Sequence, residues 1–315
     1  MNDQPQYSLD EVTKIEALQL IDWTLNEDLG SSDPDDQLDV TTASTVPDNV
    51  KGSASFVSRQ DGVVCGVAVS ELVVKKINRG LNLEVVRRDG DSLASGDVIA
   101  VLSGNAQDIL LAERTCLNFM GRLSGISSMT ASFVQQVVGT SAKVLDTRKT
   151  TPGWRRLEKF SVKCGGGSNH RMGLYDAVLI KDNHLAMMDA LTETPMREVG
   201  EAIDNARKWV SANADRLPNG SNTIIQIEVD RIDQFEKAIQ HHPDIVLLDN
   251  MSNEQLASAV EIRNGKSPKV LLEASGGVNL DTIANIAKTG VDRISVGALT
   301  HSSINLDIGL DWTIG

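Results

Sequence analysis

The sequence predicts an α/β protein whose second half forms a TIM-like α/β barrel, either complete or with fewer than eight strands. Short apolar runs recur through residues 144–296, and segments with the polarity of helices lie between several of them. Continuous apolar strands that alternate with helices are typical of parallel β-structure that is buried on both faces. An open doubly wound sheet shows the same alternation and is the alternative fold.

The residues that follow the apolar runs indicate where a site lies. We expect strands at 144–145, 177–180, 224–229, 245–248, 270–272 and 294–296, and helices at 233–241, 252–264 and 280–288. Charged residues or glycines follow most of the strands. In a β/α barrel the carboxyl ends of all strands converge on one face, which carries the active site.

The N-terminal part is expected to form a separate small α/β domain. Ser8 to Glu11 has the Ser-x-x-Glu form of a capping box, so we expect a helix over residues 9–27. The Asp-rich residues 30–39 are expected to form an exposed loop. Further strands are expected at 52–59, 62–69, 82–88 and 97–103, a short helix at 70–79, and two helices within 106–138 that are broken near Gly121 to Gly125. The expected domain limits are 1–116 for this domain, 117–302 for the barrel, and 303–315 for a C-terminal tail that packs back on the N-terminal domain.

The composition excludes several classes of function. The 315 residues carry a formal net charge of -13, which argues against a general affinity for nucleic acid or anionic membranes. Aromatic residues make up only 3% of the chain, too few for the stacking platforms of single-strand binders. The three cysteines form no C-x-x-C pair, and no apolar run is long enough for a membrane-spanning helix. We therefore expect a cytoplasmic protein that binds neither nucleic acid nor membranes.

The negative charge is concentrated at the start of the chain, and a basic segment follows later. Residues 1–50 hold twelve acidic residues and one basic residue. Residues 148–181 hold eight basic and two acidic residues, a net charge of +6. Arginine forks match the paired oxygens of carboxylates and phosphates, so this segment predicts an anion-binding site. A solvated basic helix face is the alternative, and it applies least to Arg148, Lys149 and Lys181, which lie at predicted strand ends.

Two carboxylates are expected on the same rim of the barrel. Glu228 and Asp249 lie 21 residues apart, the length of one βα repeat. In that position they can accept ribose hydroxyl protons, hold Mg²⁺ or stabilise a positively charged sugar. The alternative is that one of them merely pairs with a Lys or Arg of the rim.

Three glycine-containing turns are candidates for ligand contacts. The run GGGSNHR at 165–171 allows a close backbone approach and places a histidine and an arginine where they can meet a carboxylate. The turns at 275–277 and 296–298 close the last two predicted strands, and each is expected to lead into a helix whose N-terminus binds phosphate. His301 follows the second turn and is expected near that phosphate. A mobile loop and two tight structural turns are the alternatives.

Nine motifs occur in order along almost the whole chain. They are AERTCLNF at 112–119, SGI at 124–126, DTRKTTPG at 146–153, GGGSNHR at 165–171, LIKDNH at 179–184, IEV at 227–229, LLDN at 247–250, EASGG at 273–277 and SVGA at 295–298. With these motifs the sequence resembles quinolinate phosphoribosyltransferase, the decarboxylating nicotinate-nucleotide pyrophosphorylase. The resemblance implies an N-terminal α/β sandwich and a C-terminal α/β barrel. It also implies a pentosyl transfer of NAD biosynthesis, in which quinolinate and 5-phosphoribosyl 1-pyrophosphate give nicotinate mononucleotide, CO2 and pyrophosphate.

The resemblance further implies a cofactor, an assembly and residue roles. Mg²⁺ is the implied cofactor, with no organic cofactor, and a homodimer or a larger assembly of dimers is implied, in which Arg114 of the partner subunit completes each site. The implied catalytic residues are Lys149, Lys181, Glu228 and Asp249, the last two also being candidates to hold Mg²⁺. The implied substrate-binding residues are Arg114, Thr147, Arg148, Lys149, His170, Arg171 and Lys181. The implied ribose and phosphate contacts are Glu228, Asp249, Ser275, Gly276, Gly277, Val296, Gly297, Ala298 and His301.

The sequence departs from the family pattern at two places. An Asp-rich insertion separates residues 27–30 from residues 39–41, which are continuous in the family, and the stretch 192–222 is long. Both are expected surface features that affect packing and assembly, not chemistry.

Three other functions are consistent with parts of the chain. Lys181 at a strand end is also typical of a Schiff-base lyase. A relative of the family found at molybdate-transport loci shares its motifs, and only an assay separates the two. Residues 85–104 resemble a lipoyl-type hairpin, but no lysine occurs between Lys76 and Lys143 to carry the group.

Overall fold

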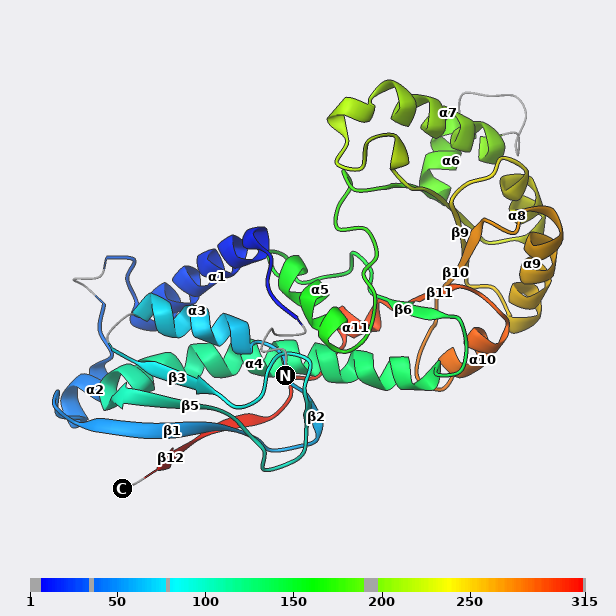
Figure 1. Cartoon of the computed structure of the whole chain (residues 1–315). Helices are drawn as coiled ribbons and strands as arrows, with labels where there is room; N and C mark the ends of the chain where they lie inside the picture. The colour runs from blue at the N-terminus through cyan, green and yellow to red at the C-terminus, as the bar shows by residue number, and fades with distance from the viewer. Residues whose placement is uncertain (1–6, 34–36, 78–79, 190–197, 314–315) are drawn as a thin grey trace, which may run out of the picture. The chain divides into compact units, whose positions relative to one another are not determined.

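The computed structural model describes residues 7–33, 37–77, 80–189 and 198–313 (Figure 1). The chain divides into two compact units. The N-terminal unit joins residues 1–131 with 150–167 and 299–315, and the sheet unit contains residues 132–149 and 168–298. These limits differ from the expected 1–116 and 117–302 in two places. The helix Ala106–Gln136 continues past residue 116 and packs in the N-terminal unit, and α5 (Arg155–Cys164) packs its apolar side chains into the same core.

The N-terminal unit contains an antiparallel sheet and helices. Its elements are α1 (Glu11–Leu29), α2 (Val40–Thr45), β1 (Lys51–Ser58), β2 (Gly62–Val63), α3 (Val67–Ile77), β3 (Asn82–Val85), β4 (Ser92–Leu93), β5 (Val98–Asn105), most of α4 (Ala106–Gln136), α5, most of α11 (Ala298–His301) and β12 (Ile308–Thr313). The main sheet has the order β12-β1-β5-β3, and β2 pairs with β4. The last strand, β12, runs antiparallel to β1, with Ser58 opposite Ile308.

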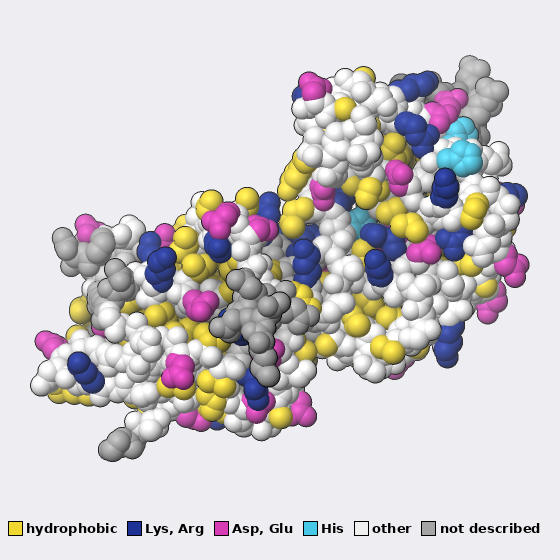
Figure 2. All heavy atoms as spheres, in the orientation of Figure 1, with side chains coloured by type: hydrophobic (Ala, Val, Ile, Leu, Met, Phe, Trp, Pro, Cys, Tyr) yellow, Lys and Arg dark blue, Asp and Glu magenta, His cyan; other side chains and the backbone are white. Residues whose placement is uncertain are grey.

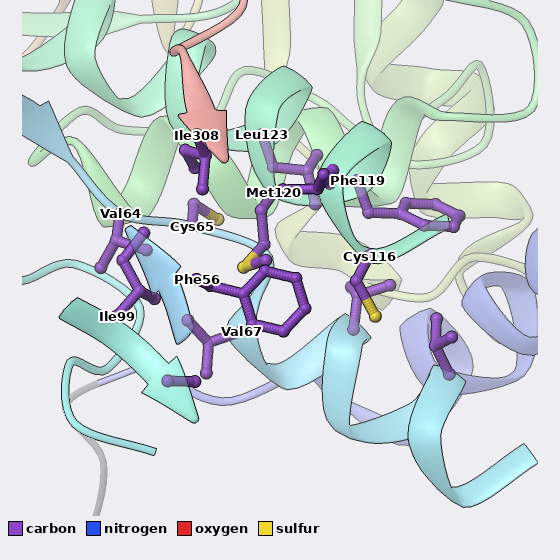
Figure 3. Close-up of a cluster of buried hydrophobic side chains, with 14 of the residues drawn as sticks. Phe56, Val64, Cys65, Val67, Ile99, Cys116, Phe119, Met120, Leu123 and Ile308 are labelled. Carbon is purple, nitrogen blue, oxygen red and sulfur yellow. The ribbon is translucent and has the colours of Figure 1, made fainter. Parts of the chain in front are cut away.

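The core of this unit lies between its sheet and α4. Phe56 of β1 and Ile99 of β5 are fully buried, and Met120 of α4 lies beside Phe56 (Figure 3). Phe119 and Leu123 of the same helix are buried too, and the Phe119 ring stacks on Trp154 with centroids 5.0 Å apart. Each fully buried side chain of this size contributes about 1.5–3 kcal/mol relative to an exposed one. The sheet and helix are therefore held together by one continuous apolar layer.

The expected break in α4 is wrong, because α4 is one helix of 31 residues. Gly121 and Gly125 do not interrupt it. A Cβ at Gly125 would collide with the Ile304 carbonyl group, and one at Gly121 would lie 3.2 Å from the Leu306 carbonyl oxygen. The two glycines let the segment that precedes β12 pass close to the helix, a packing role for glycine rather than a conformational one.

Two predictions at the starts of helices are also corrected. The N-cap of α1 is Asp10, not Ser8: its Oδ1 accepts the Thr13 N–H at 2.7 Å. The strand expected at 62–69 is only the two-residue β2, and α3 begins at Val67. The buried Asp89 carboxylate accepts the N–H groups of Val67 and Ala68 at 2.9 and 3.2 Å, so a distant residue starts the helix where β-branched residues favour a strand.

The sheet unit contains a six-stranded parallel sheet. Its elements are β6 (Lys143–Leu145), β7 (Val178–Ile180), α6 (Asp182–Asp189), α7 (Glu198–Ala212), η2 (Ala214–Arg216), η3 (Gly220–Asn222), β8 (Ile225–Val229), α8 (Ile232–Gln240), β9 (Ile245–Asp249), α9 (Asn253–Lys266), β10 (Leu271–Ser275), α10 (Ile283–Lys288) and β11 (Arg293–Ser295). All six strands predicted from the apolar runs are present. Part of the long stretch 192–222 and part of the loop 30–39 lie outside the described residues.

The strand order shows that this sheet is an incomplete barrel. The order is β6-β11-β10-β9-β8-β7, and every neighbouring pair is parallel. From β7 to β11 each strand lies beside its successor, and β6 then lies beside β11, as in a barrel whose first and last strands meet. A doubly wound sheet would instead reverse its order at a switch point. Among the described residues β6 and β7 form the two edges, so the barrel prediction is confirmed in its form with fewer than eight strands (Figure 1).

Two further properties of the described chain bear on its partners. Acidic and basic side chains are interspersed on the face shown in Figure 2. None of the described helices combines the length and the apolar character needed to cross a membrane.

Candidate active site

The parallel sheet brings the functional candidates to one edge. Because the strands run in the same direction, their carboxyl ends lie together. The residues at or just beyond these ends are Asp146 after β6, Lys181 after β7, Glu228 near the end of β8, Asp249 at the end of β9, Ser275 at the end of β10 and Val296 after β11. In the strand register Asp249 lies directly beside Ser275. Every strand of the unit thus delivers a residue to this edge, as the sequence predicted.

A lysine and a carboxylate form an ion pair on two neighbouring strands of this edge. Lys181 Nζ lies 2.5 Å from Glu228 Oε2, and the Lys181 side chain is 43% exposed. Glu228 therefore pairs with a basic residue of the rim, which was the alternative expected for one of the two carboxylates. Because much of the lysine side chain still faces solvent, the pair can open toward an anionic ligand.

Asp249 and the glycine turn after β10 lie in contact. Asn250, with a φ of 53°, donates from its Nδ2 to Asp249 Oδ2 at 2.8 Å and from its backbone N–H to the Ser275 carbonyl oxygen at 2.8 Å. A Cβ at Gly276 would collide with the Asn250 side chain, whereas Gly277, with a φ of 60°, has open space beside it. Both glycines have a positive φ, 90° at Gly276 and 60° at Gly277, and Gly276 is required for packing as well.

The two glycine turns differ in their distance from the helix that follows. After Gly277 the chain continues to Ile283 before α10 begins, so no helix N-terminus follows that turn directly. After Gly297 the short helix α11 begins at once with Ala298. The phosphate contacts expected at the two turns stay predictions.

Asp146 organises the start of the site, a role that the sequence analysis did not assign. It is fully buried, and its Oδ2 accepts from Asn169 Nδ2 at 2.6 Å while its Oδ1 accepts the His170 N–H at 2.8 Å. Ser168 forms a parallel bridge with Leu145 of β6. The GGGSNHR segment is therefore fixed beside the end of β6, and the alternative of a mobile loop is wrong for its second half.

Arg171 follows His170 in this segment, and its guanidinium group lacks one hydrogen-bond partner. Its Nη1 donates to the Ala177 carbonyl oxygen at 2.8 Å, but its Nε is buried and has no hydrogen-bond partner among the described residues. Burial and the nearby positive charge of Arg148 lower the pKa of Arg171 below its usual value. Two guanidinium groups close enough to repel each other form a site that an anion stabilises.

The basic segment divides between the two units. Arg148 and Lys149 are exposed beyond β6 in the sheet unit, and Thr147 Oγ1 accepts the Lys149 N–H at 3.0 Å. In the N-terminal unit Arg156 Nε lies 3.0 Å from Glu16 Oε1 of α1. The helical part of the segment is thus used for packing in its own unit.

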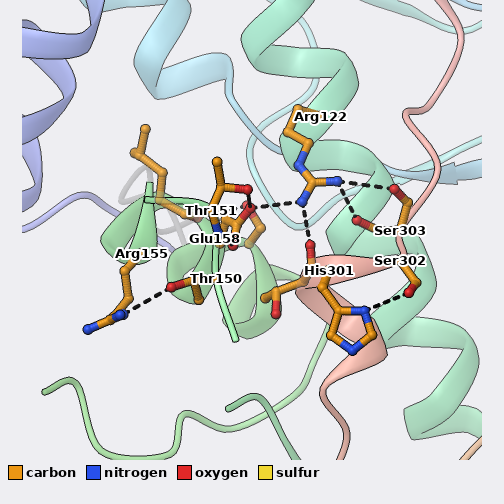
Figure 4. Close-up of polar contacts among 11 residues, drawn as sticks. Arg122, Thr150, Thr151, Arg155, Glu158, His301, Ser302 and Ser303 are labelled. Carbon is orange, nitrogen blue, oxygen red and sulfur yellow. Dashed lines mark hydrogen bonds and ion pairs between the residues drawn. The ribbon is translucent and has the colours of Figure 1, made fainter. Parts of the chain in front are cut away.

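Two predicted site residues belong to the N-terminal unit. Arg114 is exposed on α4. His301 is exposed at the end of α11, where its Nδ1 lies 2.7 Å from Ser302 Oγ (Figure 4). The roles expected for both residues stay predictions.

A buried ion pair fixes the neighbourhood of His301. Glu158 is fully buried and pairs with Arg122 Nη2 at 2.8 Å (Figure 4). Glu158 also accepts from Thr151 Oγ1 at 2.8 Å, and Arg122 donates to Ser303 Oγ at 2.9 Å. This network joins α4, α5 and the segment after α11 within the N-terminal unit.

The carboxylates at this edge are compatible with the expected Mg²⁺. Among the described residues no group of three or more His, Cys, Asp or Glu side chains forms a metal site. Mg²⁺ bound with a phosphorylated substrate usually takes only one or two protein carboxylates, with phosphate and water oxygens as the other ligands. Glu228 and Asp249 fit that requirement.

Comparisons with known proteins identify the family. Residues 39–124 match the family model for the quinolinate phosphoribosyl transferase N-terminal domain, and residues 126–311 match that for the C-terminal domain. A nicotinate-nucleotide pyrophosphorylase (carboxylating) of Mycobacterium leprae is 43% identical over 276 residues, 87% of this chain and 91% of that protein. A quinolinate phosphoribosyltransferase (decarboxylating) of Nicotiana tabacum is 36% identical over 315 residues, 97% of this chain and 82% of that protein.

Solved structures agree with this assignment. The nicotinate-nucleotide pyrophosphorylase from Francisella tularensis superposes with a TM-score of 0.82 at 34% identity, covering 99% of this chain and 100% of that one. The corresponding protein from Ehrlichia chaffeensis has a TM-score of 0.81 at 40% identity, covering 94% and 98%. The chain therefore belongs to the quinolinate phosphoribosyltransferase family.

Proposed function

We propose that the protein transfers the 5-phosphoribosyl group of 5-phosphoribosyl 1-pyrophosphate to quinolinate and releases CO2. The products are nicotinate mononucleotide and pyrophosphate, in the de novo synthesis of NAD. The relatives that are 36–43% identical over most of the chain carry this activity in their names. The chain is thus a pentosyltransferase.

The pair of arginines supports quinolinate as the acceptor most directly. Quinolinate is a pyridine with two carboxylates on adjacent carbons. Arg171 has a buried Nε without a partner among the described residues, and it repels the neighbouring Arg148. A dianion between the two would pair with both guanidinium groups and remove that repulsion. Lys149 and Lys181 add positive charge at the ends of β6 and β7.

The rim carboxylates are suited to the sugar. As the bond between the ribose C1 and pyrophosphate breaks, positive charge develops on the ring, and Glu228 and Asp249 stabilise it. The pyridine nitrogen then forms the new bond to C1. Its positive charge accepts the electron pair that remains when the C2 carboxylate leaves as CO2, and a proton from solvent takes its place. Little acid–base work is needed, so orientation of the two substrates dominates.

Mg²⁺ and the phosphate contacts are further parts of the proposal. Mg²⁺ bound with the donor would offset charge on the pyrophosphate, with Glu228 and Asp249 as its candidate protein ligands. The backbone of Ser275 to Gly277 and that of Val296 to Ala298 are the candidate phosphate contacts. Open space beside Gly277 supports the first of them.

The assembly and the location are proposed on separate grounds. We place Arg114 of the partner subunit in each site of a homodimer, since Arg114 is exposed on α4. We place the protein in the cytoplasm because its three cysteines are buried and free, as suits a reducing compartment. Some plant relatives are named as mitochondrial or chloroplastic proteins.

One assay tests the activity. Purified protein is mixed with Mg²⁺, quinolinate and 5-phosphoribosyl 1-pyrophosphate, and nicotinate mononucleotide and CO2 are measured together. We expect equal amounts of both, and poor turnover of nicotinate, which lacks the second carboxylate. Efficient use of nicotinate would contradict the proposal. Trapping of a substrate adduct on Lys181 by borohydride would instead indicate a Schiff-base lyase.

A further inference from the structure

The buried carboxylate of Glu273, on β10, has no role in the proposed function. It is fully buried in the sheet unit and is approached by basic or polar groups from three different segments. Arg293 Nε of β11 lies 2.8 Å from its Oε2, and Gln226 Nε2 of β8 lies 3.3 Å from the same oxygen. His170 Nε2 lies 3.3 Å from its Oε1, a close polar contact and not an aligned hydrogen bond, because Oε1 has no hydrogen-bond partner among the described residues. Burial alone disfavours the charged carboxylate, but His170 and Arg293 outweigh burial and lower the pKa of Glu273 to about 2.

The hydrogen bonds of His170 define its tautomer. Its Nδ1 accepts the backbone N–H of Arg171 at 2.8 Å, so Nδ1 carries no proton. The ring proton is therefore on Nε2, which faces Glu273. With its side chain only 8% exposed, the imidazole is held between a carboxylate and the amide of the next residue.

Arg171 is consequently fixed from both ends. Its backbone N–H is bound by His170, whose own N–H is bound by Asp146, and its Nη1 is bound by the Ala177 carbonyl oxygen. The Nε of the guanidinium group is buried and has no hydrogen-bond partner among the described residues. The direction of that group depends on the backbone at residues 170 and 171.

We propose that Glu273 is a positioning residue that acts through His170: it holds the Nε2–H tautomer, and this tautomer fixes the backbone of Arg171 for binding one carboxylate of the acceptor. The proposal rests on the proposed function of Arg171. It assigns His170 the orientation of Arg171, since Nδ1 accepts the Arg171 N–H and Nε2 faces Glu273 Oε1 at 3.3 Å. The sugar donor gains nothing from this arrangement, so the effect is specific to the acceptor.

Glu273→Gln replaces one carboxylate oxygen by an NH2 group and should reverse the tautomer. The oxygen of the new amide is retained by the two donors Arg293 and Gln226, which leaves the NH2 group facing His170. Nε2 must then become the acceptor, the ring proton moves to Nδ1, and the hydrogen bond to the Arg171 amide is lost. The loss of one net hydrogen bond predicts that KM for quinolinate rises about threefold to tenfold, with kcat and the KM for the sugar donor nearly unchanged.

Two readouts and a matched control test the inference. Nitrogen NMR of labelled histidine should show the Nε2–H form of His170 in the wild type and the Nδ1–H form in E273Q, with E273D retaining the wild-type form. Asp292→Asn is the control, because Asp292 pairs with Arg263 at 2.7 Å and accepts the Leu272 N–H at the opposite, amino end of the same sheet. D292N should lower stability without changing either KM.

The possible results separate this inference from the proposed function. An unchanged tautomer in E273Q, or an equal rise of both KM values there and in D292N, would overturn the inference. If E273Q does not fold, His170→Gln is the second variant, because it leaves the Glu273–Arg293 pair in place. It should give the same selective rise of the quinolinate KM, and an unchanged KM would contradict the inference. A wild-type protein that forms no nicotinate mononucleotide refutes the function, while the tautomer shift is still measurable.

Discussion

At the scale of single residues, the proposed site is a group of cations that suits an anionic ligand. Arg148→Ala should remove one of the two proposed guanidinium partners of the acceptor and leave a substrate carboxylate unpaired. The expected fall in kcat/KM corresponds to about 2–5 kcal/mol of lost transition-state stabilisation. Steady-state kinetics with quinolinate as the varied substrate measures it. Lys163→Ala is the matched control, because Lys163 belongs to the same basic segment but is exposed on α5. Similar losses in both variants would show that general charge, not a defined pocket, binds the acceptor.

The sequence predicted the residues at the strand ends and missed those that hold them. Lys181, Glu228 and Asp249 were predictable because parallel strands bring their carboxyl ends together whatever the details of packing. Asp146 and Glu273 act through contacts with residues 20 or more positions away in the chain, such as His170. A local pattern does not carry that information. The only available signal was a charged residue at the end of an otherwise apolar run.

At the scale of elements, long-range contacts decided where the local pattern failed. Val67 and Val69 were expected in a strand, yet Asp89 caps this segment as the start of the helix α3. Burial raises the pKa of Asp89 to about 6, more than its hydrogen bonds from the α3 amides lower it. Because the folded pKa lies above the ordinary value of 3.8, the folded state binds the proton more tightly than the unfolded state.

Asp89 therefore predicts a pH dependence of stability. Its contribution is fully present below about pH 4 and is lost as the pH rises to about 6, an effect of about 3 kcal/mol. The free energy of unfolding is measured with urea from pH 4 to 7 for the wild type and for Asp89→Asn, whose amide does not titrate. The difference between the two curves gives the contribution of Asp89. Asp97→Asn is the control: the Ala94 N–H lowers the pKa of Asp97, so the contribution of Asp97 is present above about pH 4 and should not change from pH 4 to 7. A wild-type curve parallel to that of D89N would refute the assignment.

Two glycines in different helices, Gly125 in α4 and Gly265 in α9, should respond oppositely to replacement by alanine. Gly125→Ala should destabilise the protein by about 1–3 kcal/mol, because the new Cβ would collide with the Ile304 carbonyl group. Gly265→Ala, in α9, meets no atom within 4 Å and should stabilise by about 0.5–1 kcal/mol, since alanine loses less entropy in a helix. Thermal unfolding of both variants measures the difference. If both variants raised the unfolding temperature equally, Gly125 would have no packing role and would only disfavour the helix, as its sequence context suggested.

At the scale of the whole molecule, the two units were predictable in kind but not in extent. The short strands and turns expected in the first part and the recurring apolar runs of the second part indicate two architectures, and both are present. Residues 150–167 lie between two strands of the barrel in sequence, yet pack in the other unit through Leu157 and Phe160. Amphipathic helices do not specify in their own sequence which core they join. Only the contact partner decides that.

Assembly gives the last prediction, because Arg114 belongs to one unit and Arg148 to the other. If Arg114 of the partner subunit completes each site, Arg114→Ala and Arg148→Ala should each be nearly inactive alone. A mixture unfolded and refolded together should regain activity, since a mixed dimer contains one site with both arginines intact. Random pairing puts half of the chains into mixed dimers with one good site of two, so about a quarter of wild-type activity is expected. If Arg114 instead acted within its own chain, every site in the mixture would lack one arginine, and refolding would restore nothing.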